Sequence, residues 1–410
     1  GVAGMTVALE IARQGFNVDL VEREKELGGS LVNMNSVFLN ATDPKKIITP
    51  LKEAVEKDKR ITVHTNSNAK ELAGYTGNFE LDVEENTKTQ TISTGAIVVA
   101  TGSREKKPEG MYLYGKNPNV ITQMELEDRF KKGDFTSENV VMIQCVGARD
   151  ENLPGCSRTC CVDAVKNAKL LKEKNPNSRV FILYRDMMMF GIFEDGYRNS
   201  QSKLGVEFLR YSPEKPPTVE EKEGKLVVTV YDSLFGREIE IGADKIILST
   251  PQVPSEGTEE LQKILRVPLS PQGFFLEGHV KLRPLEFISD GLYLCGSCQS
   301  PKELSLAIAQ AAGAASKVCS LLSHDIMETE ATTSVVNEEL CIACGRCIEI
   351  CPFSAISFKE NENGEQKSWI NSAMCKSCGL CASVCPNGAI TPRHFSTPQI
   401  IAMIDALLEA

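Results

Sequence analysis

The sequence predicts an α/β fold followed by a small α+β module that is dense in cysteine. Segments with helical apolar spacing alternate with short apolar strands over most of the chain, and eight of the fifteen cysteines lie between residues 341 and 385. Alternating strands and helices favour a parallel sheet with crossover helices. The 410 residues also leave room for two or three domains.

The first unit begins with helical spacing over residues 5–14 and a strand over 17–22 that ends in an acid. Residues 79–84 and 90–93 are predicted to form a β-meander, and residues 95–101 a buried strand. A second unit follows, with a strand at 139–145, a helix at 162–174, a strand at 179–184 and a strand-rich stretch at 205–250.

The rest of the chain closes the first unit and adds the module. Strands at 245–249 and 292–295 are expected to return to the first sheet, and 302–322 to form a well-buried helix. A last helix after Ser396 carries an apolar stripe that we expect to pack against its own chain. The predicted segments are 1–135 (first domain), 136–245 (second domain), 246–325 (return to the first), 326–337 (linker), 338–392 (cysteine-dense module) and 393–410 (closing helix).

Composition narrows the class of protein. Hydrophobic residues make up 42% and charged residues 24%, as in ordinary globular proteins. The net charge of −10 and the lack of a basic cluster argue against a nucleic-acid partner. Apolar runs such as 96–100 are too short to span a bilayer and no signal peptide is visible, so we expect a cytoplasmic protein. Fifteen cysteines in such a chain favour metal or cluster ligation over a disulfide scaffold.

The C-terminal cysteines form two C-x2-C-x2-C-x3-C-P runs. This is the spacing of two-cluster bacterial ferredoxins, in which the fourth cysteine of each run binds the other cluster. One [4Fe–4S] cluster is therefore assigned to Cys341, Cys344, Cys347 and Cys385. The other is assigned to Cys375, Cys378, Cys381 and Cys351. Zinc is the alternative, although zinc sites seldom need eight thiolates in a doubled pattern.

The chain opens on the tail of a dinucleotide-binding motif. Gly1 and Gly4 stand at the start of the first helix, and Glu22 ends the following strand, about where a ribose-binding acid belongs. Gly28 and Gly29 come after the acid and suit a close approach of backbone to a cofactor. The alternative interpretation of Gly1 and Gly4 is a glycine pair that only allows close helix packing and binds no cofactor. Because the motif is broken and no initiator Met is present, we expect an N-terminal piece to be missing.

Two later strand ends complete the arrangement: Ala100, Thr101 and Gly102 after one strand, and Gly296 and Ser297 after another. At this point the chain resembles two-dinucleotide-fold flavoproteins of the thioredoxin-reductase type. The resemblance implies that the first fold holds FAD, that the acid contacts the adenosine ribose and that the late strand approaches the flavin. Ser297 stands where that family usually has Asp, so the ribitol contact there is in doubt.

The second dinucleotide fold departs from this pattern. No second Gly-rich loop follows the strand at 139–145; four cysteines occur there instead, at Cys145, Cys156, Cys160 and Cys161. Judged from the residues alone, cluster ligation and a set of buried or disulfide-forming thiols are equally good interpretations.

The surrounding motifs identify a family. The segments 144–149 and 156–161, followed by 184–186, resemble the A-type subunit of heterodisulfide reductase, as do 74–79 and 295–302. The resemblance covers nearly the whole chain. It implies FAD, a third [4Fe–4S] cluster on these four cysteines, and flavin-based electron bifurcation. Longer methanogen forms carry an N-terminal cluster domain and an inserted ferredoxin domain, which this sequence lacks.

Three further residues are singled out. The resemblance makes Lys166 a candidate for a hydrogen bond to flavin N5, whereas a plain surface lysine of a helix needs no such role. Cys295 and Cys298 form a CxxC near the expected flavin edge. They could be a redox pair or extra ligands, but reduced thiols that pack the site are the favoured interpretation.

The sequence thus indicates an oxidoreductase: an FAD- and [4Fe–4S]-dependent electron-transfer subunit. The resemblance implies other heterodisulfide-reductase subunits, a hydrogenase or formate dehydrogenase module, and ferredoxin as partners. One alternative is an NAD(P)H:ferredoxin-type flavoprotein oxidoreductase, resembling the small subunit of glutamate synthase, which would need a second Gly-rich loop. Another is a non-catalytic iron–sulfur scaffold that has lost its flavin.

Overall fold

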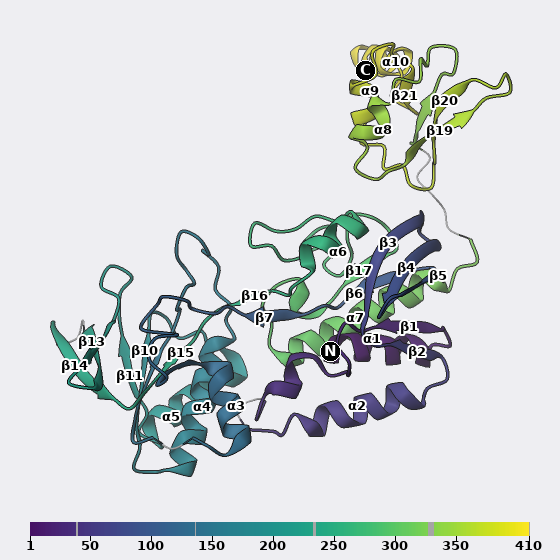
Figure 1. Cartoon of the computed structure of the whole chain (residues 1–410). Coiled ribbons are helices and arrows are strands. Elements are labelled where there is room, and N and C mark those ends of the chain that lie inside the picture. The colour runs from purple at the N-terminus through teal and green to yellow at the C-terminus, as the bar shows by residue number, and fades with distance from the viewer. Residues whose placement is uncertain (38–39, 136, 233–234, 327–331, 410) are drawn as a thin grey trace.

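The computed structural model describes residues 1–410 apart from 38–39, 136, 233–234, 327–331 and 410. Figure 1 shows two α/β domains next to each other and a C-terminal module, residues 332–409, beyond them. The two domains are the first and second dinucleotide-type folds that the sequence predicts.

The first domain is organised around helix α1 (Val2–Arg13), most of whose side chains are buried. Strand β1 (Val18–Val21) pairs in parallel with β2 (Ile61–His64), and helix α2 (Lys45–Lys57) lies between them in the chain. An antiparallel meander follows, formed by β3 (Ser67–Tyr75), β4 (Asn78–Glu85) and β5 (Lys88–Thr94). The predicted first helix, first strand and meander are confirmed.

A later segment of the chain, residues 292–322, completes the first domain. Strand β6 (Ile97–Val99) pairs in parallel with β17 (Leu292–Leu294), which confirms the predicted return of 292–295. The 3-10 turn η3 (Gly296–Cys298) leads to helix α7 (Leu304–Leu322). Among the described helices α7 is long and apolar enough to cross a membrane, by length and composition only. One face of it packs with α1 in the core of the first domain, so it is buried on that face rather than all round.

The second domain is a five-stranded parallel sheet in the order β11-β10-β9-β15-β8. Its strands are β8 (Val120–Thr122), β9 (Asn139–Ile143), β10 (Arg179–Tyr184), β11 (Glu207–Arg210) and β15 (Lys245–Leu248). The expectation that 245–249 returns to the first sheet is therefore wrong, because β15 lies between β8 and β9. The predicted boundaries at 135 and 245 are also displaced, because β8 lies before residue 135 and most of β15 lies after residue 245.

Helices and a second meander cover this sheet. They are α3 (Gln123–Lys132), α4 (Cys160–Lys174), η2 (Gly191–Phe193), α5 (Glu194–Ser202), β12 (Thr218–Lys222), β13 (Lys225–Asp232) and β14 (Arg237–Ala243). The start of α3 is fixed by a reciprocal capping box between Thr122 and Glu125. The α4 side chains that face inward, such as Ala164 and Ala168, pack on the core of this domain.

Two short antiparallel strands connect the domains. β7 (Ser103–Glu105) leaves the first domain and β16 (Gln252–Pro254) returns to it, and the two pair with each other (Figure 1). Helix α6 (Thr258–Leu265) then packs beside the first meander.

The C-terminal module contains two antiparallel strand pairs and two short helices. The elements are β18 (Ser334–Val336) with β21 (Ile390–Pro392), β19 (Ile356–Glu360) with β20 (Gln366–Ile370), α8 (Arg346–Ile350) and α9 (Leu380–Ser383). The expected linker at 326–337 is thus too long, because residues 334–336 are a strand of the module. Part of that linker, 327–331, lies outside the described residues.

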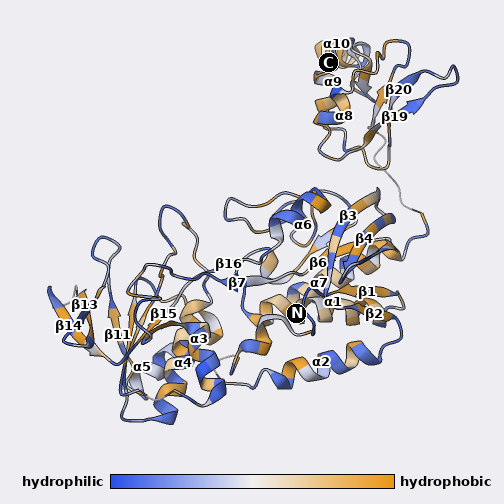
Figure 2. Cartoon of the chain, in the orientation of Figure 1, coloured by the Kyte–Doolittle hydropathy of each residue, from blue (hydrophilic) through white to orange (hydrophobic). Residues whose placement is uncertain are grey.

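The predicted last helix is present as α10 (Thr397–Leu408); Ser396 caps it in a capping box, and Pro398 lies in its first turn. Its apolar stripe is exposed, from 42% at Ile400 to 81% at Leu408, and none of its side chains is buried. Figure 2 shows this run of hydrophobic residues at the surface of the module. The expectation that the stripe packs against its own chain is wrong.

Candidate functional site: a dinucleotide cleft beside a cysteine cluster

The first domain contains a cleft of about 1660 Å³. Nine of the residues predicted from sequence line it: Gly1, Gly4, Glu22, Gly28, Gly29, Ala100, Thr101, Gly102 and Ser297. Gly296, the tenth, lies next to α1 with a φ of +76°, and a Cβ there would be 3.0 Å from the Cβ of Ala3. The cleft is thus built from strand ends and a helix start that are far apart in sequence.

The shape of the cleft depends on a close backbone contact. Gly28 has a φ of +139° and Gly29 a φ of +63°, conformations that favour glycine. A Cβ on Gly29 would be 2.8 Å from the Cα of Gly1. The loop after β1 therefore lies directly against the start of α1, where free backbone N–H groups suit a phosphate.

The acid at the end of β1 is fixed in the same cleft. The carboxylate of Glu22 accepts a hydrogen bond from the Glu24 N–H at 3.1 Å. A glycine-lined helix start with an acid at the next strand end is the arrangement that holds a dinucleotide. The residues present therefore fit FAD, which would supply one- and two-electron chemistry when bound.

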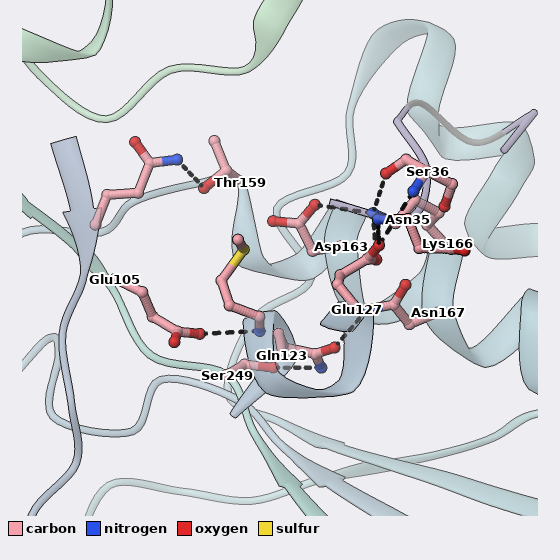
Figure 3. A network of polar contacts seen from close by, with 12 residues as sticks. Asn35, Ser36, Glu105, Gln123, Glu127, Thr159, Asp163, Lys166, Asn167 and Ser249 are labelled. Carbon is pink, nitrogen blue, oxygen red and sulfur yellow. Dashed lines mark hydrogen bonds and ion pairs between the residues drawn. The ribbon is translucent and has the colours of Figure 1, made fainter. Parts of the chain in front are cut away.

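Lys166 is buried and forms an ion pair, which corrects the alternative of a surface lysine. Its Nζ lies 2.7 Å from Oε1 of Glu127, and both side chains are only 2% exposed. The same ammonium donates to the carbonyl of Ser36 at 2.8 Å, as Figure 3 shows. The other carboxylate oxygen of Glu127 accepts from the backbone N–H groups of Asn35 and Ser36. We call these four residues the interdomain clamp.

The interdomain clamp joins the two domains, and its four residues are not among those that line the cleft, although Met34, Val37 and Asp163 beside them are. Glu127 and Lys166 come from α3 and α4 of the second domain, whereas Asn35 and Ser36 follow η1 (Gly29–Asn33) of the first. Asp163, one turn before Lys166, lines the cleft and lies 3.8 Å from the Lys166 ammonium. Sequence reasoning missed Glu127, because no local pattern signals a partner so far away in the chain.

We expect Lys166→Met to lower the stability of the folded chain by about 3–5 kcal/mol, because it leaves the Glu127 carboxylate buried and uncompensated. The control is Lys169→Met on the same helix, whose ion pair with Glu173 has side chains 35% and 50% exposed. That change should cost at most about 1 kcal/mol. Chemical denaturation followed by circular dichroism compares the two, and equal losses would contradict a special role for the buried pair.

The four cysteines predicted in the second domain come together between β9 and α4. Cys145 follows β9 in a left-handed conformation with φ of 61°, and Cys160 and Cys161 are the first residues of α4. A hydrogen bond with Cys161, followed by burial and the nearby Cys145 and Cys156, raises the pKa of the Cys160 thiol. We call Cys145, Cys156, Cys160 and Cys161 the central cysteines.

The central cysteines supply four free thiols, and a [4Fe–4S] cluster takes one thiolate on each of its four irons. Nη1 of Arg149 and Nε of Arg185 are buried next to the central cysteines without a hydrogen-bond partner among the described residues. Unpartnered donors of this kind fit the sulfur atoms of a cluster.

The C-terminal module repeats one local geometry around its two cysteine runs. Ala343 and Ser377 are both left-handed, with φ of 54° and 52°, and a left-handed glycine follows each of them two residues later. In each run the sulfur of the fourth cysteine accepts a backbone N–H four residues on, at 3.3 Å for Cys351 and 3.2 Å for Cys385. A small cavity in the module is lined by the cysteines Cys351, Cys375, Cys378 and Cys381. These are the four residues that the spacing assigns to one cluster.

Cys295 and Cys298 are buried thiols. Cys298 donates hydrogen bonds from its sulfur to the carbonyls of Val99 and Cys295, at 3.3 and 3.1 Å. Burial raises the pKa of Cys298 to about 11 and that of Cys295 still further, so both are protonated at neutral pH. Neither forms a disulfide. These observations support the interpretation as packing thiols.

Lys302 also lines the cleft, and sequence reasoning missed it although it ends the quoted 295–302 motif. Its ammonium donates to Oγ of Ser300 at 2.8 Å, and its side chain is largely buried. Burial lowers the pKa of Lys302 to about 8. The cleft therefore has a cation on the Ser297 side whose charge is lost in mildly alkaline solution.

Lys302 should give the protein a measurable pH dependence. The folded pKa of about 8 lies below the value of about 10.4 in an unfolded chain, so between them the unfolded state binds more protons. The stability of wild type should therefore rise, relative to Lys302→Met, as the pH increases through that window. Melting temperatures of both proteins across the window test this. Lys317→Met, which removes a lysine that is 52% exposed, is the control for loss of a surface lysine.

These observations define a class of protein: an oxidoreductase with two dinucleotide-type domains and a module for two [4Fe–4S] clusters. Residues 1–148 match the family described as pyridine nucleotide-disulphide oxidoreductase, and residues 340–389 match the 4Fe-4S dicluster domain. The thioredoxin reductase of T. acidophilum has the same fold, with a TM-score of 0.55 and 16% identity over 79% of this chain and 96% of that one. The enzyme of Lactococcus lactis gives a TM-score of 0.54.

Proteins related in sequence identify the family more narrowly than the fold does. The A-type subunit of the H(2):CoB-CoM heterodisulfide,ferredoxin reductase of Methanothermobacter thermautotrophicus is 32% identical over 100% of this chain and 75% of its own length. The A-type iron-sulfur subunit of the CoB–CoM heterodisulfide reductase of Methanocaldococcus jannaschii is also 32% identical, over 100% of this chain and 76% of its own length. The chain belongs to the family of A-type subunits of heterodisulfide reductase. The first alignment is 501 residues long, so that relative carries extra residues inside the matched region.

Proposed function

We propose that the chain is the FAD and iron–sulfur subunit of a heterodisulfide-reductase-type complex, and that its flavin divides electron pairs between ferredoxin and a disulfide-reducing partner. One observation carries this proposal. Two of the central cysteines, Cys160 and Cys161, stand at the start of α4, and Thr159, Val162 and Asp163 of the same segment line the dinucleotide cleft. A one-electron carrier there would be next to a two-electron cofactor, the arrangement that separating an electron pair requires.

The proposal assigns a role to each set of residues. The glycines and Glu22 would hold the FAD, and the central cysteines would bind a third [4Fe–4S] cluster. The eight cysteines of the C-terminal module would bind the other two clusters and carry electrons to or from another subunit. The hydrogen bond from Lys166 to flavin N5 stays a prediction, and to form it the ammonium would have to leave Glu127 and Ser36.

The names of relatives guide the choice of partners. The relative from Methanococcus maripaludis, 32% identical, is the A-type subunit of an H(2)/formate:CoB-CoM heterodisulfide,ferredoxin reductase. We propose by analogy that this chain acts in the cytoplasm with other heterodisulfide-reductase subunits, with a hydrogenase or formate dehydrogenase module, and with ferredoxin.

Anaerobic visible spectroscopy tests the proposal. The cluster-loaded, FAD-supplied protein is mixed in turn with NADH, NADPH and reduced ferredoxin. We expect ferredoxin to bleach the flavin and cluster bands and both nicotinamides to leave them unchanged, because no Gly-rich phosphate loop follows β9. Rapid bleaching by NADH or NADPH would instead identify an NAD(P)H:ferredoxin-type oxidoreductase. A chain that retains no FAD would be an iron–sulfur scaffold.

A further inference from the structure

Arg149, Arg185 and Arg210 form a connected group near Cys145, and none of them is among the residues that line the cleft. Arg149 donates from Nη2 to Asp186 at 2.7 Å, and Arg185 donates from Nη1 to the carbonyl of Arg149 at 2.8 Å. The guanidinium of Arg185 also lies over the ring of Tyr211, 5.8 Å from its centroid. These contacts fix both guanidinium planes, so their remaining N–H groups have defined directions.

Each of these two arginines has one buried donor atom without a hydrogen-bond partner in the described part of the chain. Nη1 of Arg149 and Nε of Arg185 are buried and hydrogen-bond to no described residue. The Ala148 N–H donates to the carbonyl of Cys145 at 3.4 Å, and Tyr211, beneath Arg185, donates to the carbonyl of Gln144 at 2.6 Å, so both guanidiniums lie in the neighbourhood of Cys145. A buried donor without a partner is costly. Its presence beside a predicted cluster ligand indicates that the acceptor belongs to the bound group.

Three guanidiniums lie together here, those of Arg149, Arg185 and Arg210. Asp186 is shared by Arg149 and by Arg210, whose Nη2 donates to it at 2.9 Å, so one carboxylate balances two guanidiniums. Arg185 makes no ion pair in the described part of the chain. Glu214 lies near Arg185 and Asp163 lies near Cys161, so these two acids offset part of the positive charge.

We propose that Arg149 and Arg185 donate hydrogen bonds to the sulfur atoms of the central cluster and raise its reduction potential. The inference rests on the proposed cluster at the central cysteines. Reduction adds one negative charge to a cluster, and that charge is stabilised by N–H donors and by nearby cations in a partly buried site. The two arginines are thus positioning and tuning residues that favour electron transfer from the flavin to this cluster.

A redox titration followed by electron paramagnetic resonance tests this in the cluster-loaded full chain. The central cluster is the signal that Cys156→Ser abolishes. We expect Arg149→Gln to shift the one-electron reduction equilibrium of that signal at least tenfold toward the oxidised form, which is about 59 mV. Arg149→Lys keeps the charge but loses the planar fork, so its shift should be intermediate.

Two further variants keep the test decisive. Arg210→Gln removes a cation from the same Asp186 but no donor from the central cysteines, so its shift should stay below twofold. Arg185→Gln leaves the Arg149–Asp186 pair intact and should lower the potential as well, which covers the case in which Arg149→Gln does not assemble. A central signal with the wild-type potential in both Arg149→Gln and Arg185→Gln would overturn the inference. Iron for only two clusters in wild type would overturn the proposed third cluster, and the inference with it.

Discussion

Replacing Cys378 with alanine should remove one cluster of the C-terminal module and leave the other in place. Cys378 shares a cavity with Cys351, Cys375 and Cys381, although Cys351 belongs to the other sequence run. Alanine offers no ligand, so the cluster that needs this thiolate loses an iron site. We expect Cys351→Ala to abolish the same paramagnetic signal as Cys378→Ala, together with roughly half of the module's iron.

The matched experiment is Cys344→Ala, which should abolish the other signal. Cys319→Ala, on α7 and outside both runs, serves as the control that leaves all iron in place. The assignment of ligands across the two runs would be wrong if Cys351→Ala abolished the signal that Cys344→Ala abolishes.

Gly29→Ala should weaken FAD binding by about tenfold or more, a loss of at least ~1.4 kcal/mol. The left-handed conformation at φ of +63° alone costs an alanine about 1–2 kcal/mol. In addition, the new Cβ would be 2.8 Å from the Cα of Gly1, so the loop after β1 must move away from the start of α1. That movement displaces the backbone that lines the dinucleotide cleft.

Gly15→Ala separates these two effects. Gly15 has a φ of +97° at the end of α1, but a Cβ there would meet no heavy atom within 4 Å. We expect it to lower stability while FAD affinity stays at the wild-type value. Flavin fluorescence titration of the two variants and wild type makes the comparison, and equal FAD affinity in all three would contradict the role given to Gly29.

Most of the fold and of the candidate site could be predicted from patterns within short stretches of sequence. The helix at 5–14, the strand at 17–22 and the meander depend on local periodicity, and the cysteine runs depend on spacing alone. The position of β15 could not be predicted in the same way, because residues 245–249 form an apolar run that either parallel sheet could take. Strand order is decided by packing between segments far apart in the chain.

Lys166 and α10 show the same limit for single side chains. A lysine within a helix is normally exposed, and only Glu127, brought in by α3, makes its burial possible. The stripe on α10 was visible in the sequence, but a stripe predicts an apolar face and not what covers it. In both cases the missing information lies in contacts that the local sequence does not encode.

The interdomain clamp has a mechanical consequence. Swinging the second domain about the β7–β16 connection would pull Lys166 and Glu127 away from Asn35 and Ser36, leaving polar groups in the interior without partners. Such a swing is therefore uphill by several hydrogen bonds. A flavin in the cleft and a cluster at the central cysteines would keep a nearly constant separation, so the rate of electron tunnelling between them would not depend on a slow rearrangement of the domains.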